Sequence, residues 1–439
     1  DMALRRVSIS NSITSIKNIL RYHWSDIFEK INGIEKILGK DEWYAKSDYD
    51  TKGLYRNEIQ KIAKKSKLSE TYIAEKAMEI SQIQEKHIGE FLLGDSKEEF
   101  MNSLGIKTRK NKTTNQKLFF YLFFIYLPSL LVSIIILKQY FLIGIIPLSE
   151  IFVLIINKIL SKIKKPNILP RLENISNDVN TFVIIPTLVR NKEKVKEMID
   201  NLEVFYLSNK MDNLYLAFLG DCSEEDKEYM EFDDEVIETG KKEVEMLNKK
   251  YGKEIFFFLY RQRKYNSSQK KYLGYERKRG MITEFVHFLV SREKGSFIVN
   301  TIQDIPEIKY IITLDSDTIL PIDSAKKLIG TMEHPLNRPK VEGKIVTKGY
   351  GLIQPKVGIT MEAATKSIFA KLFAGDGGID AYSTAESNVY QDLFGEGIFT
   401  GKGIFHVQLF EELLKNEIPD NTVLSHDLLE GSYLRCRIG

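Results

Sequence analysis

A long uncharged segment restricts the fold of this chain more than any other feature of its sequence. Residues 118–137, LFFYLFFIYLPSLLVSIIIL, contain no charged side chain, and a helix needs about 20 mainly apolar residues to cross a bilayer. A second apolar stretch, residues 140–160, follows almost directly, although polar residues weaken its later half. The pattern predicts a transmembrane helical hairpin, which we place at 116–162.

Basic residues crowd both outer flanks of this apolar region. They are Lys107, Arg109, Lys110, Lys112 and Lys117 before it, and Lys158, Lys162, Lys164 and Lys165 after it. The positive-inside rule then puts both flanks in the cytoplasm, with membrane lipid as a partner of the hairpin. The alternative is a buried hairpin in the core of a soluble protein. It is disfavoured because core helices are seldom apolar on every face for this length.

The composition excludes several classes of protein. The 439 residues allow two or three domains, and 63 basic against 60 acidic residues give no reason to expect a nucleic-acid partner. Two distant cysteines, Cys222 and Cys436, indicate a reducing compartment rather than a disulfide framework or zinc cluster. The charged residues 1–8 do not resemble a signal peptide. Because the chain starts without methionine and stops abruptly at Gly439, we expect a fragment.

Residues 1–115 have the pattern of a helical region. Apolar residues recur at helical spacing in LYRNEIQKIAKKSK and in SETYIAEKAMEI, and Ser69 is a suitable N-cap for the second of these helices. We interpret the charges here as solvated helix faces, with a docking or regulatory module as the alternative. Residues 163–180 are a linker to the rest of the chain.

Residues 181–439 alternate strand and helix patterns. Apolar runs predict strands at 181–187, 213–221, 254–260 and 309–314, and helices are expected near 191–207, 224–250 and 279–291. Such alternation predicts an α/β domain with a mostly parallel sheet. In sheets of this kind, ligands bind beyond the carboxyl ends of the strands.

Two carboxylates follow the predicted strand at 309–314 directly. Asp315 and Asp317 repel each other unless positive charge lies between them. Mg²⁺ binds one or two carboxylates together with phosphate oxygens, so a divalent cation and a nucleotide diphosphate are one interpretation. The triplet Asp315-Ser316-Asp317 alone is not specific. The same Asp-x-Asp pattern occurs in Asp48-Tyr49-Asp50, in what looks like a turn beside a helix.

Three further features supply context. Asp221 ends a predicted strand, where it either contacts a nucleotide or caps the next helix. Basic residues 277–279, including Lys278 and Arg279, stand at the start of a helix, where they bind phosphate or form a solvated basic turn. Asp427 begins an apolar helical stretch and is either a general base or an ordinary N-terminal helix carboxylate.

At these residues the chain resembles a known family, the glucosyltransferase portion of bacterial cyclic β-1,2-glucan synthases. The similar strings are DEWYAKSDYDTKGLYRNEIQKIA, HIGEFLL, GYERKRGMITEF, YIITLDSDT, GYGLIQP, YQDLFGEGIFTGKGIF and LSHDLLEG. These strings are spread along nearly the whole chain. The family is similar in turn to the processive β-glycan synthases, so the resemblance implies a Rossmann-like GT-A domain at 181–439 behind the hairpin and the helical region.

The resemblance implies an inverting glucosyltransferase of the bacterial cytoplasmic membrane, multi-pass, with its catalytic domain facing the cytoplasm. UDP-glucose is the implied donor, a growing β-glucan the acceptor, and Mg²⁺ or Mn²⁺ the cofactor. Further membrane and processing domains of a parent protein are the remaining partners. The β-1,2 linkage rests wholly on this resemblance.

The resemblance also assigns roles residue by residue. Asp427 stands at the position of the catalytic base, and Asp315 and Asp317 stand at the positions of the metal ligands. His426 replaces a carboxylate found in related cellulose synthases. The implied substrate-binding residues are Asp221, Asp315, Lys278, Arg279, Thr187, Glu396, Gly401 and His426.

Other functions stay open at this point. Another processive β-glycan synthase fits the same residues, as does a membrane scaffold that binds nucleotide without turnover. A glycoside hydrolase fits less well, because its two carboxylates must face each other across a glycosidic bond, roughly 5–10 Å apart.

Overall fold

The structure, a computed structural model, describes residues 2–21, 31–106, 113–163, 167–373, 385–423 and 425–439. The chain divides into two compact units, Asp1–Arg109 and Lys110–Gly439. The basic flank residues at 107–112, 164 and 165 and Leu424 of the LSHDLLEG string lie outside the described residues.

The first unit is helical, as the sequence predicts. Tyr55, Ile59 and Ile62 are buried in its core, and the side chain of Ser69 caps helix α6 by accepting a hydrogen bond from the Tyr72 N–H. Asp48 caps α5 in the same way, so the acidic triplet there has a structural role. The helices are α1 (Met2–Arg21), α3 (Gly33–Leu38), α4 (Glu42–Lys46), α5 (Tyr49–Ser66), α6 (Glu70–Ile83), α7 (Gly89–Leu92) and α8 (Lys97–Ser103).

The apolar region of the second unit forms two helices, α9 (Thr114–Leu137) and α10 (Phe141–Ile163), joined by the short helix η1 (Lys138–Tyr140). They lie side by side, and the Tyr121 hydroxyl donates to Asn157 Oδ1 at 3.0 Å. By length and composition, the described residues contain one candidate membrane-spanning segment, Thr114–Ile163, which these elements share.

An eight-stranded sheet forms the centre of the second unit. Its order is β12-β10-β11-β7-β1-β2-β3-β6, and β7, β1, β2 and β3 run parallel. Strand β6 is antiparallel to β3, and β11 is antiparallel to both β7 and β10. The bounds are β1 (Thr181–Val189), β2 (Leu214–Cys222), β3 (Phe256–Arg261), β6 (Phe297–Asn300), β7 (Tyr310–Thr313), β10 (Leu352–Gln354), β11 (Gly403–His406) and β12 (Cys436–Ile438).

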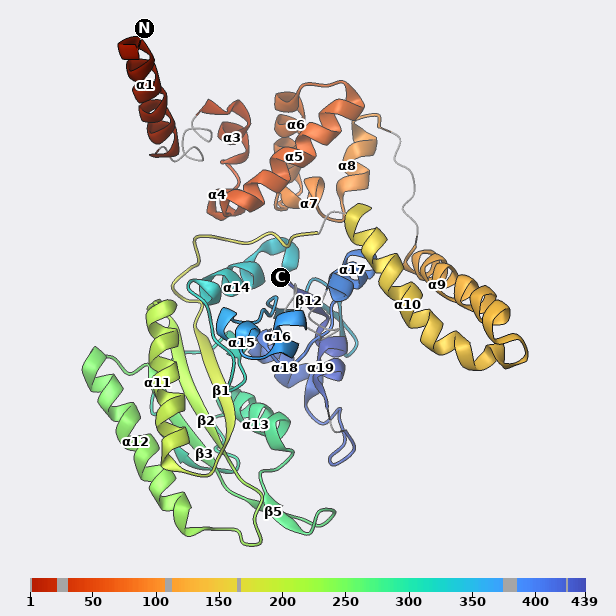
Figure 1. The fold of residues 1–439 in the computed structure, drawn as a ribbon. Coiled ribbons are helices and arrows are strands. Elements are labelled where there is room, and N and C mark those ends of the chain that lie inside the picture. The colour runs from red at the N-terminus through yellow and green to blue at the C-terminus, as the bar shows by residue number, and fades with distance from the viewer. Residues whose placement is uncertain (1, 22–30, 107–112, 164–166, 374–384, 424) are drawn as a thin grey trace. The chain divides into compact units, whose positions relative to one another are not determined.

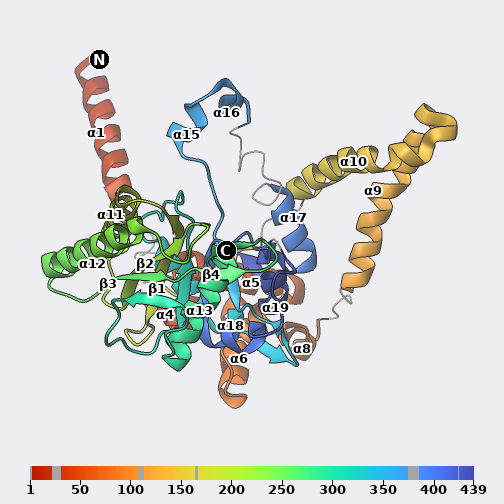
Figure 2. The same ribbon diagram turned by 90° about the horizontal axis from the view of Figure 1, so that it is seen from below.

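Helices cover both faces of the sheet (Figure 1). Side chains alternate along each strand, so that Val183 and Ile185 join the core under α11 while Phe182 and Ile184 join the core under α13. Figure 2 shows α11 and α12 on one side of β1–β3 and α13 and α18 on the other. These helices are α11 (Lys192–Ser208), α12 (Glu231–Tyr251), α13 (Arg277–Ser291) and α18 (Val407–Leu414).

The remaining elements are short. Helix α19 is the one that carries Asp427. The helices are α14 (Ser324–Glu333), η2 (Pro335–Asn337), α15 (Met361–Thr365), α16 (Ile368–Phe373), α17 (Ala385–Phe394) and α19 (Asp427–Leu434), and the strands are β4 (Lys264–Asn266), β5 (Lys271–Leu273), β8 (Lys340–Glu342) and β9 (Ile345–Lys348).

The mostly parallel sheet is confirmed, and one local expectation is wrong. Helix α12 begins at Glu231 rather than near residue 224, because Glu225 pairs with Tyr272 in a β-bridge and Asp233 accepts a hydrogen bond from the Met230 N–H at the start of the helix. The basic loop after β3 contains the antiparallel pair β4 and β5. The Glu225–Tyr272 bridge joins residues far apart in the sequence, whereas β4 and β5 form a local hairpin.

Candidate active site

Asp315 follows the end of β7, and its carboxylate accepts hydrogen bonds from the ammonium groups of two lysines. Lys278 Nζ lies 2.5 Å from Oδ1, and Lys402 Nζ lies 2.6 Å from Oδ2. Burial raises the pKa of this carboxyl group, but the two ammonium groups outweigh burial and hold the pKa below its ordinary value. Asp315 is therefore ionised at neutral pH and lies in a strongly cationic environment.

Gly401 links this charge cluster to Asp427. The Lys278 ammonium group also donates to the Gly401 carbonyl at 3.2 Å. Gly401 has a φ of +79°, and a Cβ built on it would lie 3.1 Å from Asp427 Oδ2. A side chain at position 401 would thus be strained by its backbone and crowded by the carboxylate. The glycine lets the chain carry Asp427 close to the Asp315 cluster.

Asp427 is the first residue of α19 and is partly buried. Burial is the main cause that raises its pKa, and the charge of Asp315 raises it further, whereas Lys278 and Lys402 lower it. The net shift is upward, toward the range in which a carboxylate is an effective general base. The structure therefore brings Asp427, Asp315 and Lys278, three of the residues predicted from sequence, into one electrostatic cluster.

His426 and Glu430 adjoin Asp427. His426 Nε2 lies 4.0 Å from Asp427 Oδ1 and 3.5 Å from Glu430 Oε1. Burial lowers the pKa of His426 to about 4, so the ring is neutral at physiological pH. The sequence analysis did not single out Glu430, although it stands one helical turn after His426.

Asp221 pairs with an arginine, and of its two sequence interpretations the N-cap is wrong. It is 2% exposed and forms a bidentate ion pair with Arg261 at the end of β3, with Nε–Oδ1 at 2.6 Å and Nη2–Oδ2 at 2.9 Å. The N-cap interpretation is wrong, because the residue still belongs to β2 and the next helix begins at Glu231. Both carboxylate oxygens accept from Arg261, and a nucleotide contact at Asp221 stays a prediction.

Arg261 in turn holds the backbone before α13. Its guanidinium group donates to the carbonyl oxygens of Tyr275, at 2.7 Å, and Arg277. Glu276 and Arg277 both have a φ of +50°, a conformation that ordinary residues adopt only when surrounding contacts impose it. The buried ion pair therefore fixes the strained turn from which Lys278 reaches Asp315.

Arg279 faces a loop rather than Asp315. Its guanidinium group donates to the Ile418 carbonyl at 3.3 Å and to Glu276 Oε2 at 2.9 Å. Glu276 Oε1 also accepts from the Asn421 N–H at 2.6 Å. Arg279 and Glu276 thus tie the segment that precedes Asp427 to the start of α13.

Three other predicted site residues make their contacts with residues outside this cluster. The Thr187 hydroxyl contacts Met198 Sδ at 3.8 Å, which puts it on the face of β1 that α11 covers. Glu396 is exposed and lies 3.5 Å from Arg435. Asp317 is exposed, and its Oδ1 accepts from the Thr318 hydroxyl at 3.5 Å.

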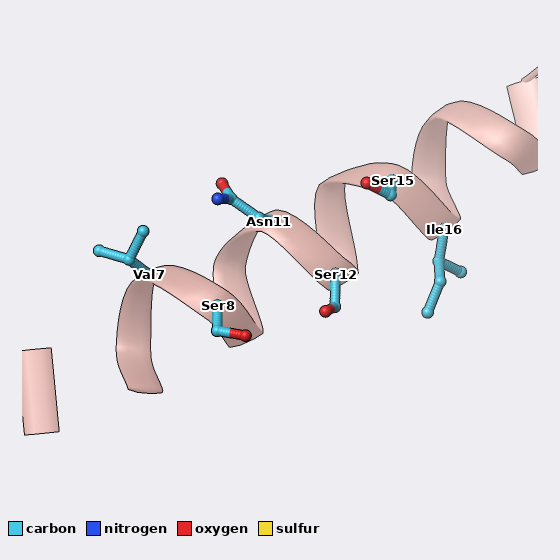
Figure 3. Close-up of a pocket in the computed structure, with 6 residues that line it drawn as sticks. All are labelled: Val7, Ser8, Asn11, Ser12, Ser15 and Ile16. Carbon is cyan, nitrogen blue, oxygen red and sulfur yellow. The ribbon is translucent and has the colours of Figure 1, made fainter. Parts of the chain in front are cut away.

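The hollow on α1 is a poor candidate site. Figure 3 shows that one helix alone supplies its lining side chains, and none of them titrates near neutral pH. They are Val7, Ser8, Asn11, Ser12, Ser15 and Ile16. Chemistry is better supported at the strand-end cluster, where carboxylates and ammonium groups converge.

Sequence reasoning missed Lys402, Arg261 and Glu430. Lys402 stands beside Gly401 in the glycine-rich string, so its position was a usable signal. Arg261 ends an apolar strand, and a charged residue at the end of a buried strand is itself a hint of a partner. Glu430 had only its helical spacing from His426, which is the same as that of many surface pairs.

The sheet, the strand-end carboxylate with its lysines, and the adjoining acid Asp427 define an α/β protein with a candidate active site at the carboxyl edge of a mostly parallel sheet. No family model matches the chain. The chain is 34% identical, over 472 aligned positions and 98% of its length, to cyclic beta-(1,2)-glucan synthase NdvB of Rhizobium meliloti (strain 1021). The match confirms the resemblance seen in the motifs: the chain is related to a portion of a cyclic β-1,2-glucan synthase. It spans 17% of the length of that relative.

The Asp221–Arg261 pair allows a test of its structural role. Asp221→Asn leaves a buried guanidinium group without its charge partner, so we expect unfolding to become easier by about 3–5 kcal/mol. Thermal unfolding of the detergent-solubilised protein measures this. Asp226→Asn, which removes an exposed partner of Lys271, is the matched control and should change the midpoint little. An unchanged midpoint for Asp221→Asn would contradict the assigned role.

Proposed function

We propose that this chain is the catalytic portion of a membrane-bound inverting glucosyltransferase, which transfers glucose from UDP-glucose to a growing β-1,2-glucan. The observation that carries the proposal is the convergence of Asp427, Asp315 and Lys278 around Gly401. An anion-binding lysine pair and a carboxylate of raised pKa are what a diphosphate leaving group and an attacking hydroxyl require. The relationship to a cyclic β-1,2-glucan synthase supports the substrate class.

A GT-A fold is part of the proposal. Four parallel strands, β7, β1, β2 and β3, with helices on both faces, support a nucleotide-sugar site at their carboxyl ends. Asp315 follows β7 at that edge, and the antiparallel strand β11 leads back from Gly401 and Lys402. The donor diphosphate would lie near the ammonium groups of Lys278 and Lys402, which supply charge-assisted hydrogen bonds to phosphate oxygens.

The residues at this edge fit a divalent cation. Both oxygens of Asp315 accept from ammonium groups, so this carboxylate stands where positive charge gathers, and Asp317 adds an exposed carboxylate two positions away. Asp317 and Asp315 would hold Mg²⁺ or Mn²⁺, which neutralises charge on the leaving diphosphate. The lysines that now share Asp315 would then be available to phosphate oxygens.

Asp427 is the proposed general base. Its carboxylate would take the proton of the acceptor 2-hydroxyl as that oxygen attacks the anomeric carbon of the donor, on the face opposite the departing UDP. One bond to carbon forms while another breaks, which inverts the α-linked donor to a β linkage. Gly401 leaves room beside the base. His426, whose ring is neutral at physiological pH, would contact the acceptor.

The proposal extends to the membrane. Helices α9 and α10 would both cross the bilayer, with the turn at η1 on the outer side and the sheet unit in the cytoplasm. The basic flanks described above support this orientation. The donor nucleotide sugar would then be taken from the cytoplasm.

Labelling tests the proposed topology. A cysteine in place of Gln139, in η1, should react with a membrane-impermeant maleimide applied to intact spheroplasts. Asn174→Cys, in the exposed segment before β1, should react only after the membrane is permeabilised. Equal protection of both positions in intact spheroplasts would contradict a spanning hairpin.

Asp317→Asn tests the metal site. Loss of a carboxylate ligand should weaken UDP binding in the presence of Mg²⁺ or Mn²⁺ at least about tenfold, equivalent to about 1.4 kcal/mol. Calorimetric titration with UDP, with and without metal, measures this. Asp304→Asn, at an exposed loop position of the same unit, serves as control. Full metal stimulation of UDP affinity in Asp317→Asn would reject the assignment.

Asp427→Asn separates catalysis from binding. The amide cannot take a proton, so we expect transfer from UDP-glucose, followed as UDP release and glucan formation, to fall by about 10²–10⁴. UDP affinity should stay near that of the unchanged protein. Undiminished transfer would show that another group is the base, and UDP binding without any release from the unchanged protein would favour a non-catalytic scaffold.

A further inference from the structure

Glu430 is a buried carboxyl group next to the proposed base. Its side chain is 5% exposed, and Oε1 lies 3.5 Å from His426 Nε2. The Glu430 N–H donates to the His426 carbonyl at 3.0 Å, so the first turn of α19 fixes the spacing of the two side chains. Potential ligand atoms of His426, Asp427 and Glu430 all lie within 4.8 Å of one another.

The electrostatics of this cluster favour one negative charge. Burial is the main cause that raises the pKa of Glu430 to about 8, and the charge of Asp427 raises it as well, whereas Arg279 and Lys278 lower it. His426 is neutral at the same pH. The raised pKa of Glu430 therefore favours its protonated form near neutral pH.

The groups around Glu430 come from the region of its own helix and from elements packed against that helix, of which strand β9 carries Lys348. Asp427 and His426 belong to its own helix, and Arg279 and Lys278 belong to α13. Helix α18 also contacts α19, but its buried Glu411 is paired with His287 Nδ1 at 2.7 Å and with Lys415 at 2.8 Å. The charge of Glu411 is thus balanced locally, and it provides a comparison for Glu430.

We propose that Glu430 is a positioning residue for Asp427: in its neutral form it holds the His426 ring beside the base and leaves Asp427 the single anion of the cluster. The inference rests on the proposed glucosyl transfer. A protonated Glu430 can donate its O–H to the His426 ring nitrogen, which accepts in the neutral imidazole, once the 3.5 Å separation shortens to hydrogen-bond length. Aspartate, the other residue with a carboxyl group, has a side chain one methylene shorter than that of Glu430.

Ionisation of Glu430 would disturb the site in two ways. A second carboxylate beside Asp427 repels it and repels the incoming diphosphate. It also removes the donor that holds His426. Activity is therefore expected below the pKa of Glu430 and is lost as the pH rises through about 8.

Substitution at position 430 tests this assignment in membranes that contain the complete protein. Glutamine keeps the length, the neutral state and a hydrogen-bond donor, so Glu430→Gln should lower transfer by about tenfold or less. In this variant, the loss of transfer activity as the pH rises through about 8 should disappear. Glu430→Ala removes the support of His426 and should lose about 100-fold. UDP affinity at neutral pH checks that each variant is folded.

Glu411→Gln is the matched control, because it alters another buried glutamate, one that lies outside the site, and it should keep the alkaline decline. A Glu430→Gln variant as inactive as Glu430→Ala, or one with an unchanged pH profile, would overturn the inference. So would a stoichiometric metal ion that is lost in Glu430→Gln, since it would make the residue a ligand. If the unchanged protein transfers no glucose from UDP-glucose at any pH, the proposed function fails instead.

Discussion

The buried ion pair between Asp221 and Arg261 supports the whole candidate site. It joins the ends of β2 and β3, and Arg261 extends the connection to the carbonyl oxygens of Tyr275 and Arg277. A buried pair is favourable only when geometry is good and the remaining donors are satisfied, and here the bidentate contact and the two carbonyls meet both conditions. The turn held in this way starts α13 and delivers Lys278 to Asp315.

Charge balance is the second organising feature. Asp315 accepts from Lys278 and Lys402, and Lys278 also reaches the Gly401 carbonyl, which lies beside Asp427. A cationic group between two acids lowers their mutual repulsion. In the proposed reaction the same lysines would exchange a carboxylate for phosphate oxygens, so that donor binding and the release of Asp315 to a metal ion become linked steps.

Local patterns predicted much of this architecture. Apolar runs located β1, β2, β3 and β7, and the position of Asp315 after a strand led directly to the sheet edge. The same reasoning did not foresee the partner of Asp221: the residue caps no helix, and it binds Arg261, 40 positions away. It also missed strands β6, β10, β11 and β12, whose short runs of three or four residues carry little periodicity.

The sequence by itself determined the apolar segment, the helical region before it, the parallel strands and the identity of the strand-end acids, because these depend on composition and on spacing within a few residues. Only the tertiary structure decided which acids meet which bases. Lys278 and Gly401 are 123 positions apart, and burial in the packed chain raises the pKa of Glu430. Long-range pairing and desolvation are properties of the packed chain, so no local pattern encodes them.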